Sequence, residues 1–186
     1  KDVSFEIEAG EFVYLIGKTG SGKSSLLKTL YADLPAKEGE ITIAGYDLRK
    51  IKRREIPMLR RKIGIVFQDF QLLYDRSVEE NLSFVLDATG WEDKEMISKR
   101  IDEVLRQVGL PNKRKSMPHQ LSGGEQQSIA VARALLDNPS VIIADEPTGN
   151  LDPDTTNDIM NLLIEISKQG KTILMATHHY NLILKY

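Results

Sequence analysis

Residues 12–30 read FVYLIGKTGSGKSSLLKTL, which is an apolar run, a glycine-rich turn and a second apolar run. The first run, residues 12–16, is typical of a buried strand, and the second, residues 25–30, is typical of a helix. Between them, residues 17–24 match the pattern G-x-x-x-x-G-K-[ST]. Its glycines permit positive φ angles, so that consecutive N–H groups turn toward one anion at a helix start. The pattern therefore predicts a phosphate loop between a strand and a helix.

The side chains of this phosphate loop have separate expected roles. Lys23 is expected to neutralise the β- and γ-phosphates of a nucleotide, and the Ser24 hydroxyl is expected to bind Mg²⁺. The other members supply backbone N–H groups and the first turn of the helix. The residues expected to contact the nucleotide are Gly17, Lys18, Thr19, Gly20, Ser21, Gly22, Lys23, Ser24 and Ser25.

Short apolar runs and helix-length patterns alternate along the rest of the chain. Strands are predicted at residues 3–7, 12–16, 41–43, 63–67, 141–144 and 172–176. Helices are predicted at residues 22–31, 55–62, 78–88, 94–108, 124–136 and 153–168. This order predicts an α/β P-loop fold with a mostly parallel sheet and a small N-terminal antiparallel β portion. Residues 1–69 and 138–186 would form the nucleotide-binding core, and residues 70–137 an inserted helical sub-domain.

Composition and charge exclude several classes of protein. The 25 Lys and Arg residues are balanced by 27 Asp and Glu residues, so the overall charge does not favour nucleic acid as a partner. The absence of cysteine excludes a disulfide scaffold, a Cys-ligated zinc site and a catalytic thiol. No apolar run approaches the ~18 residues of a membrane span. A role at a membrane would therefore require something other than a spanning segment to hold the protein there.

Two adjacent carboxylates, Asp145 and Glu146, follow the apolar run at residues 141–144. Neighbouring residues of a strand point to opposite faces, so the two carboxylates are expected to have different roles. At the carboxyl end of a parallel strand, Asp145 can reach Mg²⁺ and Glu146 can hold a water in line with the γ-phosphate. Such a pair alone is often a turn or a helix cap, and its catalytic interpretation depends on the phosphate loop.

The signature segment, residues 121–127, reads LSGGEQQ and predicts a second helix start. Ser122 is expected to cap this helix, and Glu125 three residues later completes a capping box. Gly123 and Gly124 leave the first N–H groups of the helix uncovered by side chains, which creates a second anion-binding site. One nucleotide can use both helix starts if the second belongs to another copy of the chain.

With these motifs in this order, the chain resembles the nucleotide-binding domain of ABC ATPases over nearly its whole length. The resemblance implies that two copies enclose two ATP molecules head to tail, with Mg²⁺ as the metal. In this arrangement the signature segment of one copy faces the γ-phosphate bound by Lys23 of the other. The resemblance implies catalytic roles for Glu146, His178 and Gln68. It implies metal-binding roles for Ser24, Gln68 and Asp145. In addition to the phosphate loop, the residues implied to bind nucleotide are Ser122, Gly123, Gly124 and Asp152.

Residues 146–152, 67–78 and 174–183 resemble one branch of this family. The branch includes lipoprotein-release and macrolide-type exporters and cell-division ATPases, and the last two stretches favour the cell-division members. The resemblance implies an integral membrane subunit as partner, no nucleic acid, and a peripheral position on the cytoplasmic face of the inner membrane. Two alternatives stay open, namely the ATPase subunit of an exporter and a nucleotide-gated assembly module with slow hydrolysis.

The chain departs from the family pattern at two positions near the expected site. Ser128 stands where arginine is common, and His179 stands where aspartate is usual. The family's adenine-stacking aromatic residue would precede Lys1, and further elements would follow Tyr186. The resemblance therefore implies that the sequence is truncated at both ends.

Residues 50–62 show a shift in composition, because they contain seven basic residues and one acidic residue, Glu55. Two interpretations stay open. The stretch is either a solvated helix face or a surface that lies near anionic lipid headgroups or an acidic partner. The basic residues are Lys50, Lys52, Arg53, Arg54, Arg60, Arg61 and Lys62.

Overall fold

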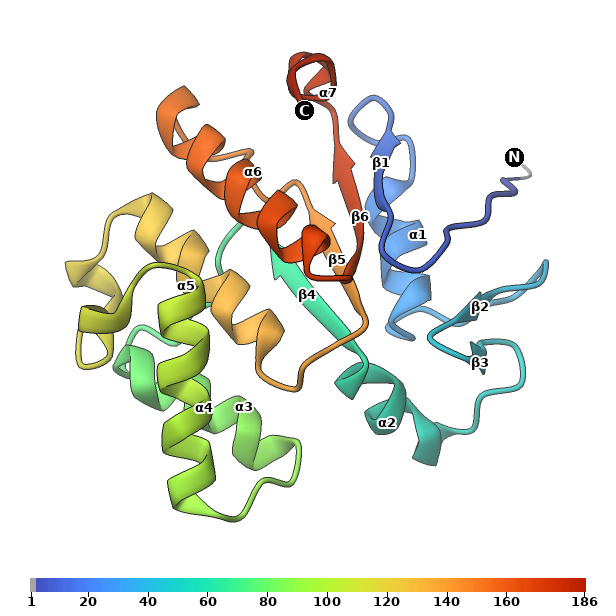
Figure 1. Ribbon diagram of the computed structural model, residues 1–186. Coiled ribbons are helices and arrows are strands. Elements are labelled where there is room, and N and C mark those ends of the chain that lie inside the picture. Colours follow the sequence, from blue (N-terminus) through green and yellow to red (C-terminus); the bar gives the residue numbers. More distant parts are fainter. Residues whose placement is uncertain (1–2) are drawn as a thin grey trace.

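The computed structural model describes residues 3–186, apart from the side chain of Ile183, and its centre is a four-stranded sheet (Figure 1). The strands are β1 (Phe12–Ile16), β4 (Ile63–Phe67), β5 (Val141–Asp145) and β6 (Thr172–Thr177), arranged in the order β1-β6-β5-β4. Every neighbouring pair is parallel. The mostly parallel sheet predicted from the sequence is thus confirmed. Since all four strands run in one direction, the residues that follow them meet at one edge of the sheet.

Helices cover both faces of this sheet, and the strand residues alternate between them. On one face α1 (Lys23–Leu30) and α2 (Ile56–Arg61) pack through Leu27, Leu30 and Leu59 against Ile143 and Leu174. On the other face α5 (Gly123–Leu135) and α6 (Pro153–Lys168) share a core with the neighbouring strand residues. This explains why most residues of these strands are apolar, as in strands buried on both faces.

Helices alone occupy the middle of the chain. These are α3 (Val78–Ala88), α4 (Lys94–Gln107) and α5, with short 3₁₀ turns at Pro111–Lys113 and Pro118–Gln120. Between positions 70 and 137 of the described chain there is no strand, as the sequence predicts. Buried residues of α3 and α4 form one continuous core with α5 and α6. The helical region is therefore packed directly against one side of the sheet.

A two-stranded antiparallel pair confirms the small β portion. Its strands are β2 (Thr42–Ile43) and β3 (Tyr46–Asp47). Ala44 and Gly45 join them with φ angles of 49° and 84°. Positive φ at both central residues is the conformation that a two-residue hairpin turn requires.

The strand predicted at residues 3–7 is wrong. The structure assigns no strand to these residues, and Val3 and Phe5 have exposed fractions of 63% and 49%. Alternating apolar residues favour extended backbone, but a strand also needs a neighbour to which its N–H and C=O groups bind. Nothing in this stretch of sequence specifies such a neighbour.

The remaining elements are a 3₁₀ turn at Arg53–Glu55 and helix α7 (Tyr180–Lys185). Predicted and observed bounds of the other helices agree closely, and they coincide for α3 and α6. In the described part of the chain, no helix combines the length and the apolar character needed to cross a bilayer.

Candidate active site

The phosphate loop leads from β1 into α1 and has the open, glycine-dependent backbone that its sequence predicts. Gly20 and Gly22 have φ angles of 79° and 98°. Gly22 caps α1 without any side-chain hydrogen bond, so the first N–H groups of this helix are not covered by a side chain. The loop is also tight, since a Cβ at Gly17 would lie 2.6 Å from Ser21 Oγ. The backbone therefore has the shape and polarity of an anion site.

Lys23 lies within this loop and points along the sheet edge toward Glu146. Its ammonium Nζ donates to the Gly17 carbonyl at 2.7 Å and lies 3.5 Å from Glu146 Oε1. The two side chains are 8% and 13% exposed. A largely buried cation and a largely buried carboxylate thus lie together beside the phosphate loop, where solvent screens their interaction less than at the surface.

Glu146 is also held by His178, which follows β6. His178 Nδ1 lies 2.9 Å from Glu146 Oε1, and the His178 backbone N–H donates to Oε2 at 3.3 Å. Both oxygens of this carboxylate are therefore oriented. The sequence motifs that name Lys23, Glu146 and His178 are far apart in the chain, and the parallel sheet brings the three residues together.

Glu146 does not continue the strand, which corrects one step of the sequence argument. Strand β5 ends at Asp145, and Glu146 takes a φ angle of 50° while its N–H donates to the Ala176 carbonyl at 3.0 Å. Positive φ is unusual for a residue with a Cβ and is found mainly where surrounding contacts enforce it, often at functional sites. The separation of Asp145 from Glu146 thus comes from this backbone turn and not from strand alternation.

Asp145 is the last residue of β5 and lies in register with Phe67 of β4 and Ala176 of β6. Its Oδ1 is buried and finds no hydrogen-bond partner within residues 3–186. An unpartnered buried acceptor costs about 1–3 kcal/mol, and more when it is charged. A cation bound at this oxygen would remove that cost, so Asp145 has the character of a metal ligand.

Gln68 follows β4 and is fastened to the segment ahead of α6. Its Nε2 donates to Asn150 Oδ1 at 3.1 Å, and Asn150 Nδ2 donates to the Gln68 carbonyl at 3.3 Å. A Cβ at Gly149 would lie 2.6 Å from Gln68 Nε2, so a larger residue there would displace the Gln68 amide. The structure thus joins Gln68 to residues 149–150 and through them to Asp152.

The signature segment begins α5 as predicted. Ser122 Oγ accepts from the Glu125 N–H at 3.2 Å, and Glu125 Oε2 accepts from the Ser122 N–H at 2.9 Å. The backbone bond from Ser122 and the nearby Lys113 ammonium hold the pKa of Glu125 below its ordinary value. Within residues 3–186, no hydrogen bond or ion pair joins residues 121–127 to the phosphate loop. In one copy of the chain the two anion sites are therefore separate.

Asp152 caps α6 beside the signature segment. Its Oδ1 accepts from the N–H groups of Asp154 and Thr155 at 3.1 and 3.0 Å, and its Oδ2 accepts from the Thr155 hydroxyl. These hydrogen bonds, led by the Thr155 hydroxyl, lower the pKa of Asp152. A Cβ at Gly124 would overlap Thr155 Cγ2. The starts of α5 and α6 are thus in direct contact.

Gln127 is a site residue whose individual role the sequence does not reveal. It is completely buried, and its Nε2 donates to the carbonyls of Phe67 and Pro147. Phe67 precedes Gln68 and Pro147 follows Glu146, so one amide links α5 to the ends of β4 and β5. Its own Oε1 has no partner. The sequence offers one sign that Gln127 is buried. It lies four and seven residues before Val131 and Ala134, and this spacing places all three on the buried face of α5.

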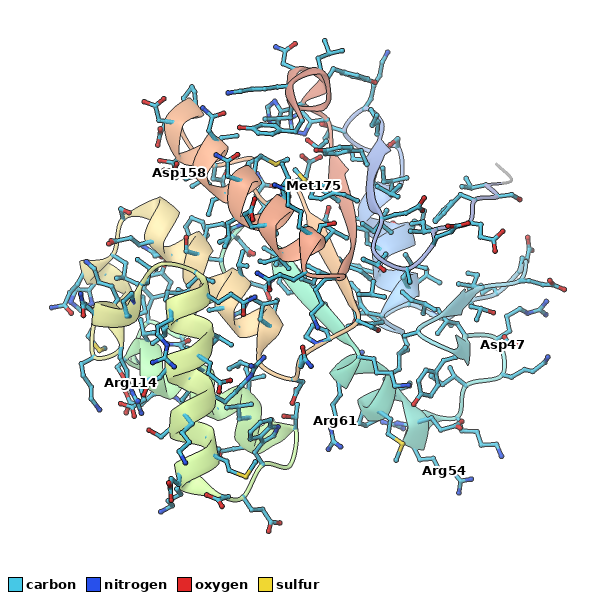
Figure 2. All side chains as sticks on the ribbon, viewed as in Figure 1. Asp47, Arg54, Arg61, Arg114, Asp158 and Met175 are labelled. Carbon is cyan, nitrogen blue, oxygen red and sulfur yellow. The ribbon has the colours of Figure 1, made fainter. Side chains whose placement is uncertain are left out.

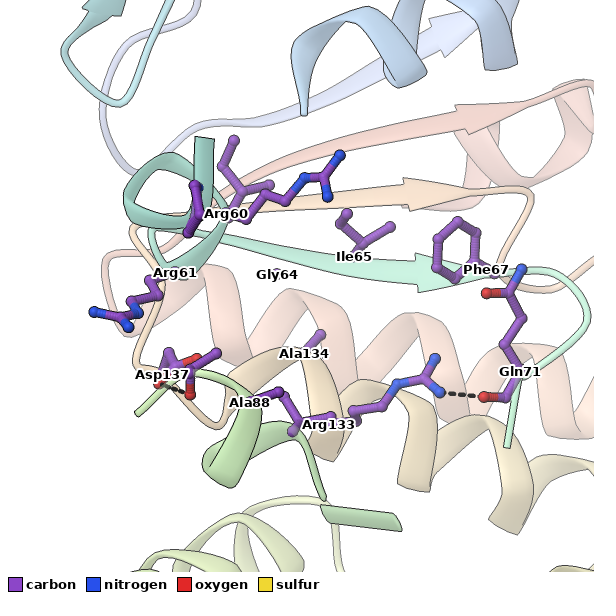
Figure 3. A pocket seen from close by; sticks show the side chains of 14 residues that line it. Arg60, Arg61, Gly64, Ile65, Phe67, Gln71, Ala88, Arg133, Ala134 and Asp137 are labelled. Carbon is purple, nitrogen blue, oxygen red and sulfur yellow. Dashed lines mark hydrogen bonds between the residues drawn. The ribbon is translucent and has the colours of Figure 1, made fainter. Parts of the chain in front are cut away.

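A separate groove of about 460 Å³ lies between α2, the β4 edge and helices α3 and α5 (Figure 3). Its floor is apolar, with Ile63, Ile65 and Val85 among its lining residues. Arg61 and Asp137 lie at one end, and Arg133 reaches Gln71 at the other. Burial lowers the pKa of Arg133. The groove therefore contacts both the core and the helical region, close to the segment that begins with Gln68.

The parallel sheet, the phosphate loop and the oriented carboxylate together define a P-loop nucleotide-binding domain. The family model described as "ABC transporter" matches residues 1–149, which is most of the chain. The chain belongs to the ABC transporter family.

Three similar proteins illustrate this membership. The cell division ATP-binding protein FtsE of Streptococcus pneumoniae serotype 2 is 49% identical over 183 residues, which cover 98% of this chain and 79% of that protein. The solved structure of cbiO1 from Clostridium perfringens, part of the ABC transporter complex cbiONQ, has a TM-score of 0.87 and 36% identity, covering 96% of this chain and 71% of that chain. The dimeric post-hydrolysis structure of the ATP-binding cassette MJ0796 has a TM-score of 0.85 and 38% identity, covering 98% of this chain and 81% of that chain.

Proposed function

We propose that this chain is the ATP-hydrolysing subunit of an ABC-type membrane complex that acts in cell division. Its similarity to FtsE supports the division role, and the ADP and Pi named for MJ0796 support the reaction. The observation that carries the proposal is the position of Glu146, which is oriented by His178 and lies beside Lys23 at the phosphate loop. This is the arrangement required to activate a water for attack on a γ-phosphate.

Different residues of this chain would bind the phosphates, neutralise their charge and activate the water. N–H groups of the phosphate loop bind the β- and γ-phosphates, and Lys23 neutralises their charge. Glu146 orients the attacking water and takes up its proton, while His178 keeps the carboxylate in place and contacts the γ-phosphate. The bond from the γ-phosphorus to the β–γ bridging oxygen breaks as the bond to the water oxygen forms, which leaves ADP and phosphate.

The donor set fits one Mg²⁺ ion held partly by the nucleotide. Asp145 supplies a carboxylate with an unpartnered oxygen, and Ser24 supplies a hydroxyl in the first turn of α1. Gln68 is the third proposed ligand and would bind through its Oε1, because its Nε2 donates to Asn150. Oxygen ligands of this kind are those that Mg²⁺ prefers. When bound, the ion would neutralise charge that develops on the phosphates.

The proposed catalytic unit contains two copies of the chain. Ser122, Gly123 and Gly124 of one copy would bind the γ-phosphate held by the other, and Asp152 would lie at the interface. The separation of the signature segment from the phosphate loop within one copy supports this, as does the dimeric structure of MJ0796. ATP would thus hold the two copies together until it is hydrolysed.

Gly124→Ala should lower turnover for two reasons that a second substitution separates. A Cβ at position 124 overlaps Thr155 Cγ2 within the chain, and it also narrows the anion site offered to the other copy. Thr155→Ser removes the overlapping methyl group and keeps the hydroxyl that binds Asp152. In the double variant we expect the wild-type melting temperature to return, while phosphate release stays at least ~10-fold low.

Thr155→Ser alone is the matched control and should keep both stability and turnover. If the double variant recovers full phosphate release, Gly124 is needed for packing within one copy only. That result would contradict its place in a shared site.

The membrane partner proposed for this subunit is an FtsX-like integral protein, which would place the chain at the cytoplasmic face of the inner membrane. We assign the groove beside β4 as the surface that binds this partner. Arg133 lines the groove and donates to the Phe70 carbonyl, two residues after Gln68. A partner that displaces Arg133 would therefore also displace the segment that begins with Gln68. The groove would then lie between a core of residues 1–69 and 138–186 and a helical sub-domain of residues 70–137. ATP-dependent closure of the dimer would be transmitted to the partner at this boundary.

The proposal predicts phosphate release from ATP that requires Mg²⁺ and stops when the ion is chelated. The measurement is made on the protein with and without its membrane subunit. Release in neither preparation would overturn the ATPase assignment. Rapid release by the isolated subunit excludes a slow nucleotide-gated assembly module, whereas release only in the complex supports one. An exporter role would instead require transport of a lipoprotein or small molecule by the reconstituted complex.

A further inference from the structure

The basic surface is formed by the seven Lys and Arg side chains of residues 50–62, all of which are exposed. They extend from the 3₁₀ turn at Arg53–Glu55 and from α2. Figure 2 shows Arg54 and Arg61 projecting outward from this part of the molecule. The surface is separate from the phosphate loop and from the signature segment. Its members are Lys50, Lys52, Arg53, Arg54, Arg60, Arg61 and Lys62.

Few carboxylates balance these charges. Lys50 pairs with Asp47 at 3.0 Å, and this is the one ion pair that the seven residues make in the described part of the chain. The single acid of the stretch, Glu55, accepts from the Lys52 backbone N–H at 2.7 Å and forms a local cap. Arg60 donates to the carbonyls of Tyr31 and Ala32, which carry no net charge. The surface therefore keeps an excess of positive charge.

An apolar side chain lies among these cations. Leu59 is completely buried and anchors α2 to the core, while Met58 next to it is 56% exposed. The preceding residue, Pro57, is exposed as well. Met58 therefore adds an exposed apolar side chain to a surface that is otherwise basic, and segments that bind at a membrane interface combine these two kinds of residue.

Anionic lipid fits this surface better than a specific acidic protein does. Among the residues that the structure describes, Lys52, Arg53 and Arg54 have no side-chain hydrogen-bond or ion-pair partner, so no described group orients them toward one partner. Long, unoriented cations suit a plane of diffuse negative charge, to which each basic residue adds roughly a fivefold gain in binding. Met58 can enter the headgroup layer between them. The cationic heads then stay in the polar layer while their aliphatic stems contact apolar surface.

We propose that the basic surface binds the anionic phospholipid headgroups of the bilayer directly, independently of the membrane subunit. Arg53 and Arg54 do not line the groove beside β4, whereas Arg60 and Arg61 do. Lipid binding by the basic surface and binding of the membrane subunit at the groove can therefore be tested with different residues. Lipid binding of this kind would raise the concentration of the subunit at the membrane before it meets its partner.

The test is co-sedimentation of the purified protein with vesicles of phosphatidylcholine, with and without added phosphatidylglycerol. We expect binding only to the vesicles with phosphatidylglycerol, and this binding should weaken as salt is raised. Arg53→Glu with Arg54→Glu should lower the partition coefficient at least ~10-fold. Lys94→Glu with Lys99→Glu changes the charge equally on the exposed face of α4 and should leave binding unchanged.

Three outcomes would overturn the proposal. They are absence of wild-type binding to the anionic vesicles, equal binding by the Arg53/Arg54 variant, and an equal loss in the α4 control. If wild type ignores the vesicles while the Arg53/Arg54 variant loses its affinity for the membrane subunit in neutral lipid, the surface binds an acidic protein instead. An unchanged melting temperature shows separately that the Arg53/Arg54 variant is folded, and this control does not depend on ATP hydrolysis, so failure here is distinct from failure of the ATPase proposal.

Discussion

Glu146→Gln should lower phosphate release from ATP by a factor on the order of 10²–10⁴, the usual contribution of a general base. The amide has the shape of the carboxylate but cannot accept the proton of the attacking water. Nucleotide binding should persist because Lys23 and the phosphate loop are unchanged. ATP-bound dimers should therefore accumulate, which size-exclusion chromatography with ATP and Mg²⁺ will detect.

A matched control for this variant is Glu165→Gln. Glu165 is exposed on α6, where it pairs with Lys168 at 2.7 Å, and its replacement should leave turnover unchanged. Unchanged turnover in Glu146→Gln would mean that another group accepts the proton. The oriented contact between His178 and Glu146 would then serve only to hold the end of β6 in place.

Lys23→Ala should weaken ATP binding by roughly 30–1000-fold, equivalent to about 2–4 kcal/mol. The Lys23 ammonium is largely buried and donates to the Gly17 carbonyl of the phosphate loop, so solvent would screen its attraction to a bound phosphate only weakly. Isothermal titration with a non-hydrolysable ATP analogue measures the change directly. Turnover should fall with affinity.

Lys28→Ala provides the comparison on the same helix. Lys28 is exposed in the last turn of α1, and its removal should change affinity by less than twofold. If Lys23→Ala keeps both the affinity and the turnover of wild type, Lys23 does not contact the nucleotide. A fall in turnover at constant affinity would instead confine Lys23 to the chemical step.

Local sequence signals predicted much of the fold. Helices α3 and α6 have the predicted bounds because their start signals are local: Ser77 and Asp152 cap the helices with their own side chains. The capping box of Ser122 and Glu125 is confirmed for the same reason. Such hydrogen bonds span three residues and depend on little else in the fold.

Contacts between distant segments were harder to predict. The extended stretch at residues 3–7 lacks a strand partner, which a local pattern cannot supply. The reciprocal bonds of Gln68 with Asn150 join residues 82 positions apart. The left-handed backbone of Glu146 depends on the Ala176 carbonyl of a neighbouring strand. Site residues could thus be named from motifs, whereas their mutual orientation required the sheet.

The amide of Gln127 sets a limit on how α5 can move. This helix begins at the signature segment and ends beside the groove, where Ala134 is one of the lining residues. Near its start, Gln127 holds the carbonyls that adjoin Gln68 and Glu146. The hydrogen bonds of Gln127 thus tie the helix that borders the groove to the ends of β4 and β5. A displacement of α5 at the groove would have to break these bonds or move both strand ends, which carry Gln68 and the carboxylate that we propose as the general base.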